Sequence, residues 1–421
     1  MLQDILMLAA FFILRIGVPF LLVIGIGYSL LQRFYGVKLD FSPKFVTGVG
    51  LVLALWALAA IAIILRFTSG LGAVTNLSDR FPLGLWIGFD VMAGAMLGGG
   101  AFVLAGLVYV FGIERYRPIL RSTILTAFLG YSLLIVALLI DVGRPQNILL
   151  ARPVYFINIH SVLWEVAMCV LTYTIVLALE FSPALFERLR WRRAWLITHK
   201  ITLPLVIIGI LLSTMHQSSL GSLWLIAPGK LYGLWYSPLL PVFFLISAVG
   251  VGLAMVTVES NLSSRAFKRG LEQDLLASLA KANAYLLGFY AAFRLADLAV
   301  RGQFQLALTP NLPMLLFWIE LGVGAILPAI LLAQPQIREN KNALFAISAV
   351  IVSCGILNRL NVSMFGLYNY TGPVYLPSWM EIVVTAAMFT FGGAVFAVLA
   401  RLLPVFPAEH GRAAAPVPVE S

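Results

Sequence analysis

The stretch ILRSTILTAFLGYSLLIVALLI, residues 119–140, carries one charged side chain, Arg121, near its beginning. A helix needs about 20 apolar residues to cross the hydrocarbon core of a bilayer. A strand of a membrane barrel would instead alternate apolar and polar residues over about ten positions, and this stretch does not. The stretch therefore predicts a helix that spans a membrane.

Ten further stretches have the same character, and the composition agrees with them. Of the 421 residues, 61% are hydrophobic and 11% are charged, which leaves too little polar surface for an ordinary soluble domain. We therefore expect an all-α polytopic membrane protein with about 11 transmembrane helices. The further stretches cover residues 8–31, 45–67, 84–112, 158–181, 199–216, 239–260, 278–299, 313–333, 342–360 and 378–403.

The basic side chains lie mainly on one side of these helices. The connections that follow the odd-numbered helices hold 18 of the 28 Lys and Arg residues, and the opposite side holds eight. By the positive-inside rule the basic connections are cytoplasmic. The N-terminus is then outside and the C-terminus in the cytoplasm. The net charge of +10 reflects this topology, so membrane lipid rather than nucleic acid is the expected surface partner.

Smaller features restrict the expected cofactors and packing. The two cysteines, Cys169 and Cys354, both lie in expected helices. An iron–sulfur cluster needs four ligands, so we expect no cluster, no metal site and no disulfide in this chain. Residues 8–31 lack the cleavage site of a signal peptide, which predicts a retained helix. Gly94 and Gly98 have the GxxxG spacing that favours close helix packing.

Polar side chains converge on the outer ends of four consecutive helices. Ionisable groups inside a bilayer are costly, which makes each one a candidate functional residue. At a rise of 1.5 Å per residue, the acid at position 165 lies about 7 Å deeper than the histidine at position 160. The converging residues are Asp90, Asp141, His160, Glu165 and His216, with Arg144 just beyond the second of these helices. Together they favour a site for a polar ligand.

Taken singly, most of these residues also have a structural explanation. Asp90 can complement a helix dipole, and Asp141 can form a surface ion pair with Arg144. His160 and His216 can each hydrogen-bond the end of a helix. The explanation is weaker for the acid at 165, which follows Trp164 inside an apolar helix beyond its first turn and is a candidate for proton exchange.

The second half of the chain repeats this tendency less strongly. We interpret most of its polar residues as an internal ion-pair network that secures the helices, with a few as candidates for a proton path. They are Arg294, Asp297, Arg301, Glu320, Asn358, Arg359 and Glu381. Glu180 and Glu259, near cytoplasmic helix ends, are better explained by solvation than as the mouth of such a path.

The histidines allow a test for haem. A transmembrane haem needs two imidazoles from facing helices at matching depth. His199 is cytoplasmic and His410 lies in the tail, so one haem between His160 and His216 is the most that the sequence permits. The hydroxyl-rich sequence after His216 is more typical of hydrogen bonding to a polar head group.

Several long motifs resemble the NrfD/polysulfide reductase membrane-subunit family. They are FPLGLWIGFDVMAGAML (81–97), GYSLLIVALLIDVGRPQN (130–147), NIHSVLWEVAMCV (158–170), LALEFSPALFERL (177–189) and TMHQSSLGSLW (214–224). The resemblance covers about residues 45–405 and is strongest to the HybB-type branch, the cytochrome b-type membrane subunits of periplasmic nickel–iron hydrogenases.

This resemblance implies a fold and a function. It implies two four-helix bundles with flanking helices, in the cytoplasmic membrane of a bacterium or archaeon. It implies a quinone, menaquinone or ubiquinone, bound towards the outer face of the first bundle, and no haem. The expected partners are a periplasmic ferredoxin-like iron–sulfur subunit and the catalytic subunits of a hydrogenase or a molybdenum enzyme. The chain would pass electrons between that iron–sulfur subunit and quinone, and would not be catalytic alone.

The expected domains follow from the helices and the resemblance. They are an extra N-terminal helix (1–40), a flanking helix with an outer loop (41–83), the first bundle with the quinone site (84–238), the second bundle (239–377), a C-terminal transmembrane helix (378–405) and a disordered cytoplasmic tail (406–421).

Two features depart from the HybB pattern. The helix over 1–40 is additional, and His160 stands where asparagine is more familiar.

Roles for the site residues combine the resemblance with the positions. We expect His216, with Ser218 nearby, to hydrogen-bond a quinone oxygen. Glu165, supported by His160, would exchange protons, and Asp90 would extend that relay. Trp164, Asp141 and Arg144 complete the expected quinone site. A proton or solute transporter and a haem-carrying electron-transfer subunit are the alternative functions, although transporters favour polar groups near the midplane.

Overall fold

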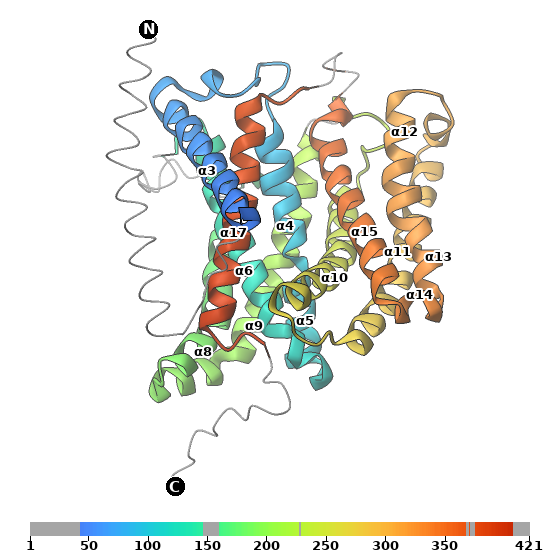
Figure 1. Ribbon diagram of the computed structural model, residues 1–421. Coiled ribbons are helices and arrows are strands. Elements are labelled where there is room, and N and C mark those ends of the chain that lie inside the picture. The colour runs from blue at the N-terminus through green and yellow to red at the C-terminus, as the bar shows by residue number, and fades with distance from the viewer. Residues whose placement is uncertain (1–42, 146–159, 227–228, 368–369, 371–374, 407–421) are drawn as a thin grey trace. The chain divides into compact units, whose positions relative to one another are not determined.

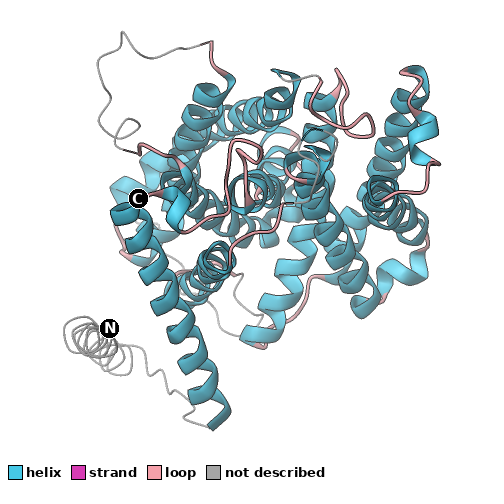
Figure 2. Cartoon of the chain, turned by 90° about the horizontal axis from the view of Figure 1, so that it is seen from above, coloured by secondary structure: helices cyan, strands magenta, loops and turns pink. Residues whose placement is uncertain are grey.

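The computed structural model describes residues 43–145, 160–226, 229–367, 370 and 375–406. The helix expected over 8–31 and the tail from residue 407 onward lie outside these described residues. The chain divides into two compact units, Met1–Ala54 and Leu55–Ser421, and the second contains every helix that follows α3. All regular elements described in it are helical (Figure 2).

Nine helices of the described part are long and apolar enough to cross a membrane, which confirms the all-α polytopic membrane fold. A further helix, α11 (Gln273–Val300), has the length but is less apolar, because it carries Lys281, Arg294 and Asp297. The nine lie in α3 (Pro43–Ser69), a composite helix over Trp86–Val110, α6 (Arg117–Asp141), α8 (Val162–Arg188), α9 (Arg192–Ser222), α10 (Leu240–Phe267), a composite helix over Leu312–Ala333, α15 (Lys341–Ser363) and α17 (Trp379–Leu402).

Both composite helices contain π-helical turns. The first consists of η3 (Trp86–Ala93), α4 (Gly94–Leu97), α5 (Gly99–Ala105) and η4 (Gly106–Val110). The second consists of α12 (Leu312–Trp318), η9 (Ile319–Ile326) and α13 (Leu327–Ala333). The hydrophobic pattern predicts an uninterrupted helix in each case. Two of these three π segments contain a buried acid, Asp90 in η3 and Glu320 in η9, whereas η4 contains none. Such turns often mark functional positions in helices.

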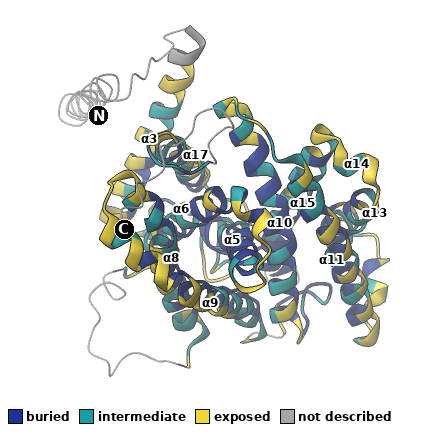
Figure 3. Ribbon diagram, turned by 90° about the horizontal axis from the view of Figure 1, so that it is seen from below, coloured by how far each residue is buried: buried dark blue, intermediate teal, exposed yellow. Residues whose placement is uncertain are grey.

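Helix α10 lies at the centre of the packing (Figure 1). It packs against α5 and α9 of the first half and against α11 and α15 of the second half. The apolar stretches of Trp86–Val110 and α10 are 78% and 61% buried, compared with 22% for α17. Figure 3 shows the same difference as dark blue along α5 and α10. The first half thus shares its core with the second.

Glycines allow the closest contact between the two halves. A Cβ atom on Gly100 would lie 2.7 Å from the carbonyl oxygen of Gly252, and one on Gly99 would lie 2.7 Å from that of Ala248. Backbones can approach this closely only where side chains are absent. The predicted GxxxG pair has a different role. Gly98 faces the ring of Tyr131, and Gly94 meets no other helix within 4 Å.

A buried carboxylate, Glu381, fastens the beginning of α17 to the loop before η3. It accepts hydrogen bonds from the backbone N–H groups of Asn76 (3.1 Å) and Leu85 (3.3 Å) and from the hydroxyl of Tyr375 (2.6 Å). Burial, together with the neighbouring Glu381, raises the pKa of the Tyr375 phenol. The indole of Trp86 also donates to the Glu381 carbonyl at 3.2 Å. These bonds replace the ion pair expected at Glu381 and hold η3 in position.

Candidate functional site

His216 lies at the centre of a fully buried polar cluster on α9. Its Nδ1 is 2.8 Å from the carbonyl oxygen of Leu212, which can only accept, so Nδ1 carries the proton. Nε2 is therefore the acceptor. The single proton of the Tyr131 hydroxyl on α6 is shared between Nε2 at 2.6 Å and the Ala95 carbonyl at 3.0 Å. The side chain of Gln217 bonds the carbonyl of Ala95 at 2.8 Å and closes the cluster towards α4. Both ring nitrogens of His216 are thus occupied.

Aromatic rings from two helices, α6 and α8, lie against this histidine. The rings of Tyr131 and Tyr173 meet edge to face at 4.8 Å, and both lie within 6 Å of the imidazole ring of His216. The hydroxyls of Tyr173 and Ser213 are buried without a hydrogen-bond partner among the described residues. Buried hydroxyls of this kind usually bind water. The cluster therefore offers places for ordered water beside the Tyr131–His216 pair.

Glu165 stands in the first turn of α8 and not beyond it as expected, because α8 begins at Val162 rather than at residue 158; the residue is half-buried. It accepts a hydrogen bond from the Ser219 hydroxyl at 2.7 Å. Ser219 is three residues after His216 and lies on the same side of α9. Ser218, the serine singled out in the sequence, bonds the carbonyls of Thr214 and Met215 in its own helix, each at 2.8 Å. The structure thus brings Ser219 rather than Ser218 to the glutamate.

Asp90 is buried in η3 and faces α17 rather than α9. Its carboxylate accepts a hydrogen bond of 2.7 Å from the Thr385 hydroxyl. Asp141 closes α6 nearby, and one of its oxygens is buried without a partner among the described residues. Arg66 lies against the same helix end and donates to the carbonyls of Ile140 (2.5 Å) and Val142 (2.6 Å). The two aspartates thus form a second group of acids, held between α3, α6 and α17.

An apolar cavity of about 460 Å³ opens beside Asp90. It runs between the first composite helix, α6, α10 and α17, and several glycines line it: Gly94, Gly98, Gly130, Gly392 and Gly393. Gly98 also contacts the ring of Tyr131. This glycine of the first composite helix therefore borders both the cavity and the His216 cluster. A chain-like apolar ligand would fit a cavity of this lining.

The remaining expected site residues lie at the margin. Trp164 is half-buried beside Glu165 on α8. His160, just before that helix, is exposed, as is Arg144 in the turn after α6. The position of a residue along an expected helix predicts which helix ends carry polar groups, but not the direction in which each side chain points.

Four contributors to the site were missed in the sequence. Tyr131, Tyr173, Gln217 and Ser219 look like ordinary residues of apolar helices. Two of them carry a weak signal, since Tyr131 is the one tyrosine of residues 119–140 and Ser219 lies one helical turn after His216.

His160 and His216, the two histidines that the sequence allows as a haem pair, have different surroundings in the structure. Axial ligation requires a ring nitrogen with a free lone pair, and both nitrogens of His216 are engaged by Leu212 and Tyr131. His160 is exposed while His216 is fully buried, so the two imidazoles have no common environment.

Comparison with known proteins identifies the family of this chain. The family model described as polysulphide reductase, NrfD, matches residues 73–370. A protein of Nitratidesulfovibrio vulgaris is 38% identical over 86% of this chain and 93% of its own length. The Escherichia coli protein named "Probable Ni/Fe-hydrogenase 2 b-type cytochrome subunit" is 34% identical over 88% of this chain and 94% of its own. The "Menaquinone reductase, integral membrane subunit" of Nitratidesulfovibrio vulgaris is 30% identical, with coverages of 81% and 87%. The chain therefore belongs to the polysulphide reductase NrfD family of membrane proteins.

Proposed function

We propose that this chain is the quinone-binding membrane subunit of a respiratory redox complex. It passes electrons between an iron–sulfur partner on the outer face of the membrane and the quinone pool. The observation that carries the proposal is the placement of the Glu165–Ser219 pair beside the buried Tyr131–His216 pair. Two relatives support it, since their names refer to a hydrogenase and to a menaquinone reductase.

The arrangement suits the chemistry of a quinone. Reduction by two electrons adds two protons, one at each carbonyl oxygen. Glu165 is half-buried and within reach of a ligand at the outer ends of α8 and α9, while Ser219 holds its carboxylate in place. Tyr131 and His216 form a second proton donor and acceptor pair behind it. Quinone is thus the proposed substrate of this site. Trp164, adjacent to Glu165, remains a proposed contact of the quinone, as do His160 and Arg144, whereas Asp141 belongs to the second group of acids beside Asp90.

Protons can reach this site from the cytoplasmic side in the same proposal. A cavity of about 540 Å³ at the basic ends of α6, α8 and α9 is lined by Glu180, together with Arg117, Arg121 and His199. Glu180 and the ring of Tyr173 both border Gly209, because a Cβ there would lie 3.1 Å and 3.3 Å from them. The two buried hydroxyls of Tyr173 and Ser213 lie between this acid and His216. Water bound to them would complete a path.

The electron carrier belongs to a partner subunit in this proposal. The chain has two cysteines, one on α8 and one on α15, and a cluster needs four ligands. Among partner types we favour a hydrogenase, because it is named for a relative at 34% identity, whereas the relatives named for a selenate reductase and a dimethyl sulfoxide reductase are 25% and 24% identical. Mass spectrometry of subunits that co-purify in mild detergent should identify an iron–sulfur protein. Recovery of the chain without one would contradict the proposal, and b-type bands in a reduced-minus-oxidised spectrum would favour the haem alternative.

Substitution of the proposed proton donor tests the site. Glu165→Gln keeps an oxygen for Ser219 but cannot transfer a proton. We expect quinone reduction by the assembled complex to fall by about 10²-fold or more, measured in membranes with a naphthoquinone as acceptor. Glu187→Gln changes an exposed acid on the same helix and should keep full activity. Equal turnover in Glu165→Gln and the wild type would overturn the role of Glu165.

A further inference from the structure

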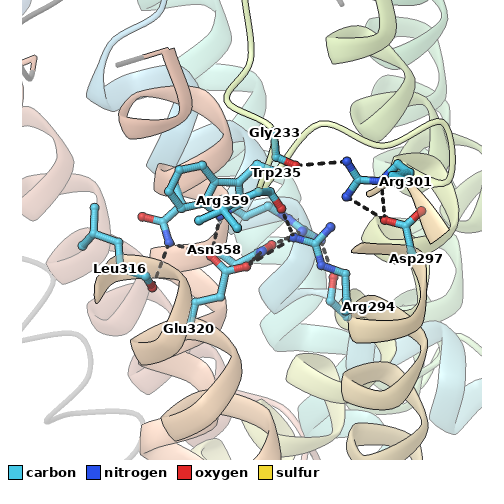
Figure 4. A network of polar contacts seen from close by, with 12 residues as sticks. Gly233, Trp235, Arg294, Asp297, Arg301, Leu316, Glu320, Asn358 and Arg359 are labelled. Atoms are coloured by element: carbon cyan, nitrogen blue, oxygen red, sulfur yellow. Dashed lines mark hydrogen bonds and ion pairs between the residues drawn. The ribbon is translucent and has the colours of Figure 1, made fainter. Parts of the chain in front are cut away.

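A cluster of buried charges, drawn in Figure 4, lies mainly in the second half of the chain. We name it the arginine cluster. Its residues are Trp235, Arg294, Glu320, Asn358, Arg359 and Asn361. The two arginine side chains are among the most enclosed of the described part, with exposures of 2% for Arg294 and 0% for Arg359.

The carboxylate of the arginine cluster is already saturated with donors. Glu320 accepts hydrogen bonds from the indole of Trp235 (3.0 Å) and from the side-chain amides of Asn358 (2.8 Å) and Asn361 (2.5 Å). All three groups can only donate at these atoms. They therefore occupy both oxygens of Glu320, and Arg294 pairs with one of them at 3.8 Å.

Arg359 has no carboxylate within ion-pair distance among the described residues. Its guanidinium donates to the Asn358 side-chain oxygen (2.7 Å), the Phe244 carbonyl (2.9 Å) and the Ser247 hydroxyl (3.0 Å). It lies 3.7 Å from the centre of the Phe244 ring. All of these partners are neutral, and Nε of Arg359 has no partner in the described part of the chain.

Arg294 is also incompletely bonded. One of its nitrogens donates to the Leu234 carbonyl at 3.1 Å, and the same nitrogen makes the 3.8 Å ion pair with Glu320. Its Nε and Nη1 are buried without a partner among the described residues. The neighbouring Arg301 pairs with Asp297 at 2.9 Å, so that pair is neutral. The region therefore carries one positive charge more than its carboxylates offset.

An unbalanced charge of this kind is costly inside a membrane protein. Arginine does not lose its proton in proteins, and a buried charge without a counter-ion costs several kcal/mol in order of magnitude. We propose that a small monovalent anion, such as chloride, binds in the arginine cluster and is held by the unpartnered N–H groups of Arg294 and Arg359. A small ion is the ligand in this proposal because both arginine side chains are almost fully buried. The unpartnered amide oxygen of Asn361 would bind water instead.

Equilibrium binding of ³⁶Cl⁻ to the full chain in lipid nanodiscs tests this site. We expect one chloride per wild-type chain, because the excess charge is one. Arg294→Gln and Arg359→Gln should each weaken binding by about tenfold or more, since each removes a charge-assisted hydrogen bond. Arg265→Gln changes an exposed arginine at the end of α10 and is the matched control, which should bind like the wild type.

The following outcomes decide whether the arginine cluster binds an anion. Absence of saturable chloride binding would overturn it, as would binding that persists in both Arg294→Gln and Arg359→Gln. If these variants fail to fold, anomalous scattering from bromide in crystals of the wild-type protein decides. A peak between the two guanidinium groups supports the site, and peaks confined to other places refute it.

Discussion

At the scale of single residues, the proposed quinone site depends on the side of α9 from which each side chain projects. His216 and Ser219 lie one turn apart and face α6 and α8, whereas Ser218 bonds back to its own helix. Neighbouring residues on a helix point about 100° apart, so adjacent serines have different environments. The hydroxyls of two successive serines therefore have different partners, one in α8 and one in their own helix.

Ser219→Ala should lower activity, and Ser218→Ala should not. The alanine at 219 removes the hydroxyl that orients the Glu165 carboxylate. A hydrogen bond to a charged group contributes about 1.5–3 kcal/mol, so we expect quinone reduction to fall by about tenfold or more. Steady-state turnover of the assembled complex in membranes provides the measurement. A larger loss in Ser218→Ala than in Ser219→Ala would contradict this orientation.

The sequence predicts which helices carry the polar residues, but it does not predict which neighbouring helix each side chain faces. Hydropathy and the spacing of charges place Asp90, Glu165 and His216 within helices. They do not show that Asp90 faces Thr385 on α17 while His216 faces Tyr131 on α6. Those partners lie 295 and 85 positions away along the chain. Such pairs are set by tertiary packing, which a single sequence does not record.

At the scale of elements, glycine and π turns shape the core. The sequence predicts one regular helix over 84–112, and the structure has π turns at both ends of it and a glycine contact in between. Each is a local change with an effect on packing. The glycines let α5 approach the backbone of α10, and the π turn of η3 directs Asp90 at α17.

Gly252→Ala should separate α5 from α10 and destabilise the protein. A Cβ there would overlap the backbone of Gly99 and Gly100, which cannot move as a side chain can. Overpacking of this kind costs about 1–3 kcal/mol. Thermal unfolding in detergent should show a lower midpoint for Gly252→Ala. Gly393→Ala adds the same methyl group on α17, where nothing lies within 4 Å, and should not lower the midpoint, because alanine is the better helix former.

At the scale of the whole molecule, the distribution of basic residues predicts orientation. The ends of α6, α8 and α9 that border the 540 Å³ cavity carry Arg117, Arg121, Arg188 and Arg192. By the positive-inside rule we expect this end to face the cytoplasm. The proposed quinone site then lies towards the outer face, where an iron–sulfur partner would dock.

Reporter fusions test this orientation. Green fluorescent protein fused to the C-terminus should fluoresce, because the tail is expected in the cytoplasm. Alkaline phosphatase fused at the same place should be inactive, because it needs export to fold. The opposite pair of results would reverse the orientation and place the Glu165 site on the cytoplasmic face.

The bonds made by Glu381 also have a consequence for biogenesis. They join residues 76, 85 and 86 to a helix made about 300 positions later. At a synthesis rate of about 5–20 residues per second, the two parts emerge roughly 15–60 s apart. During that interval η3 is inserted without the carboxylate that fixes its loop. Until α17 is made, the loop before η3 therefore lacks the hydrogen bonds to Glu381. A ribosome stalled before α17 would leave a chain in which these bonds never form.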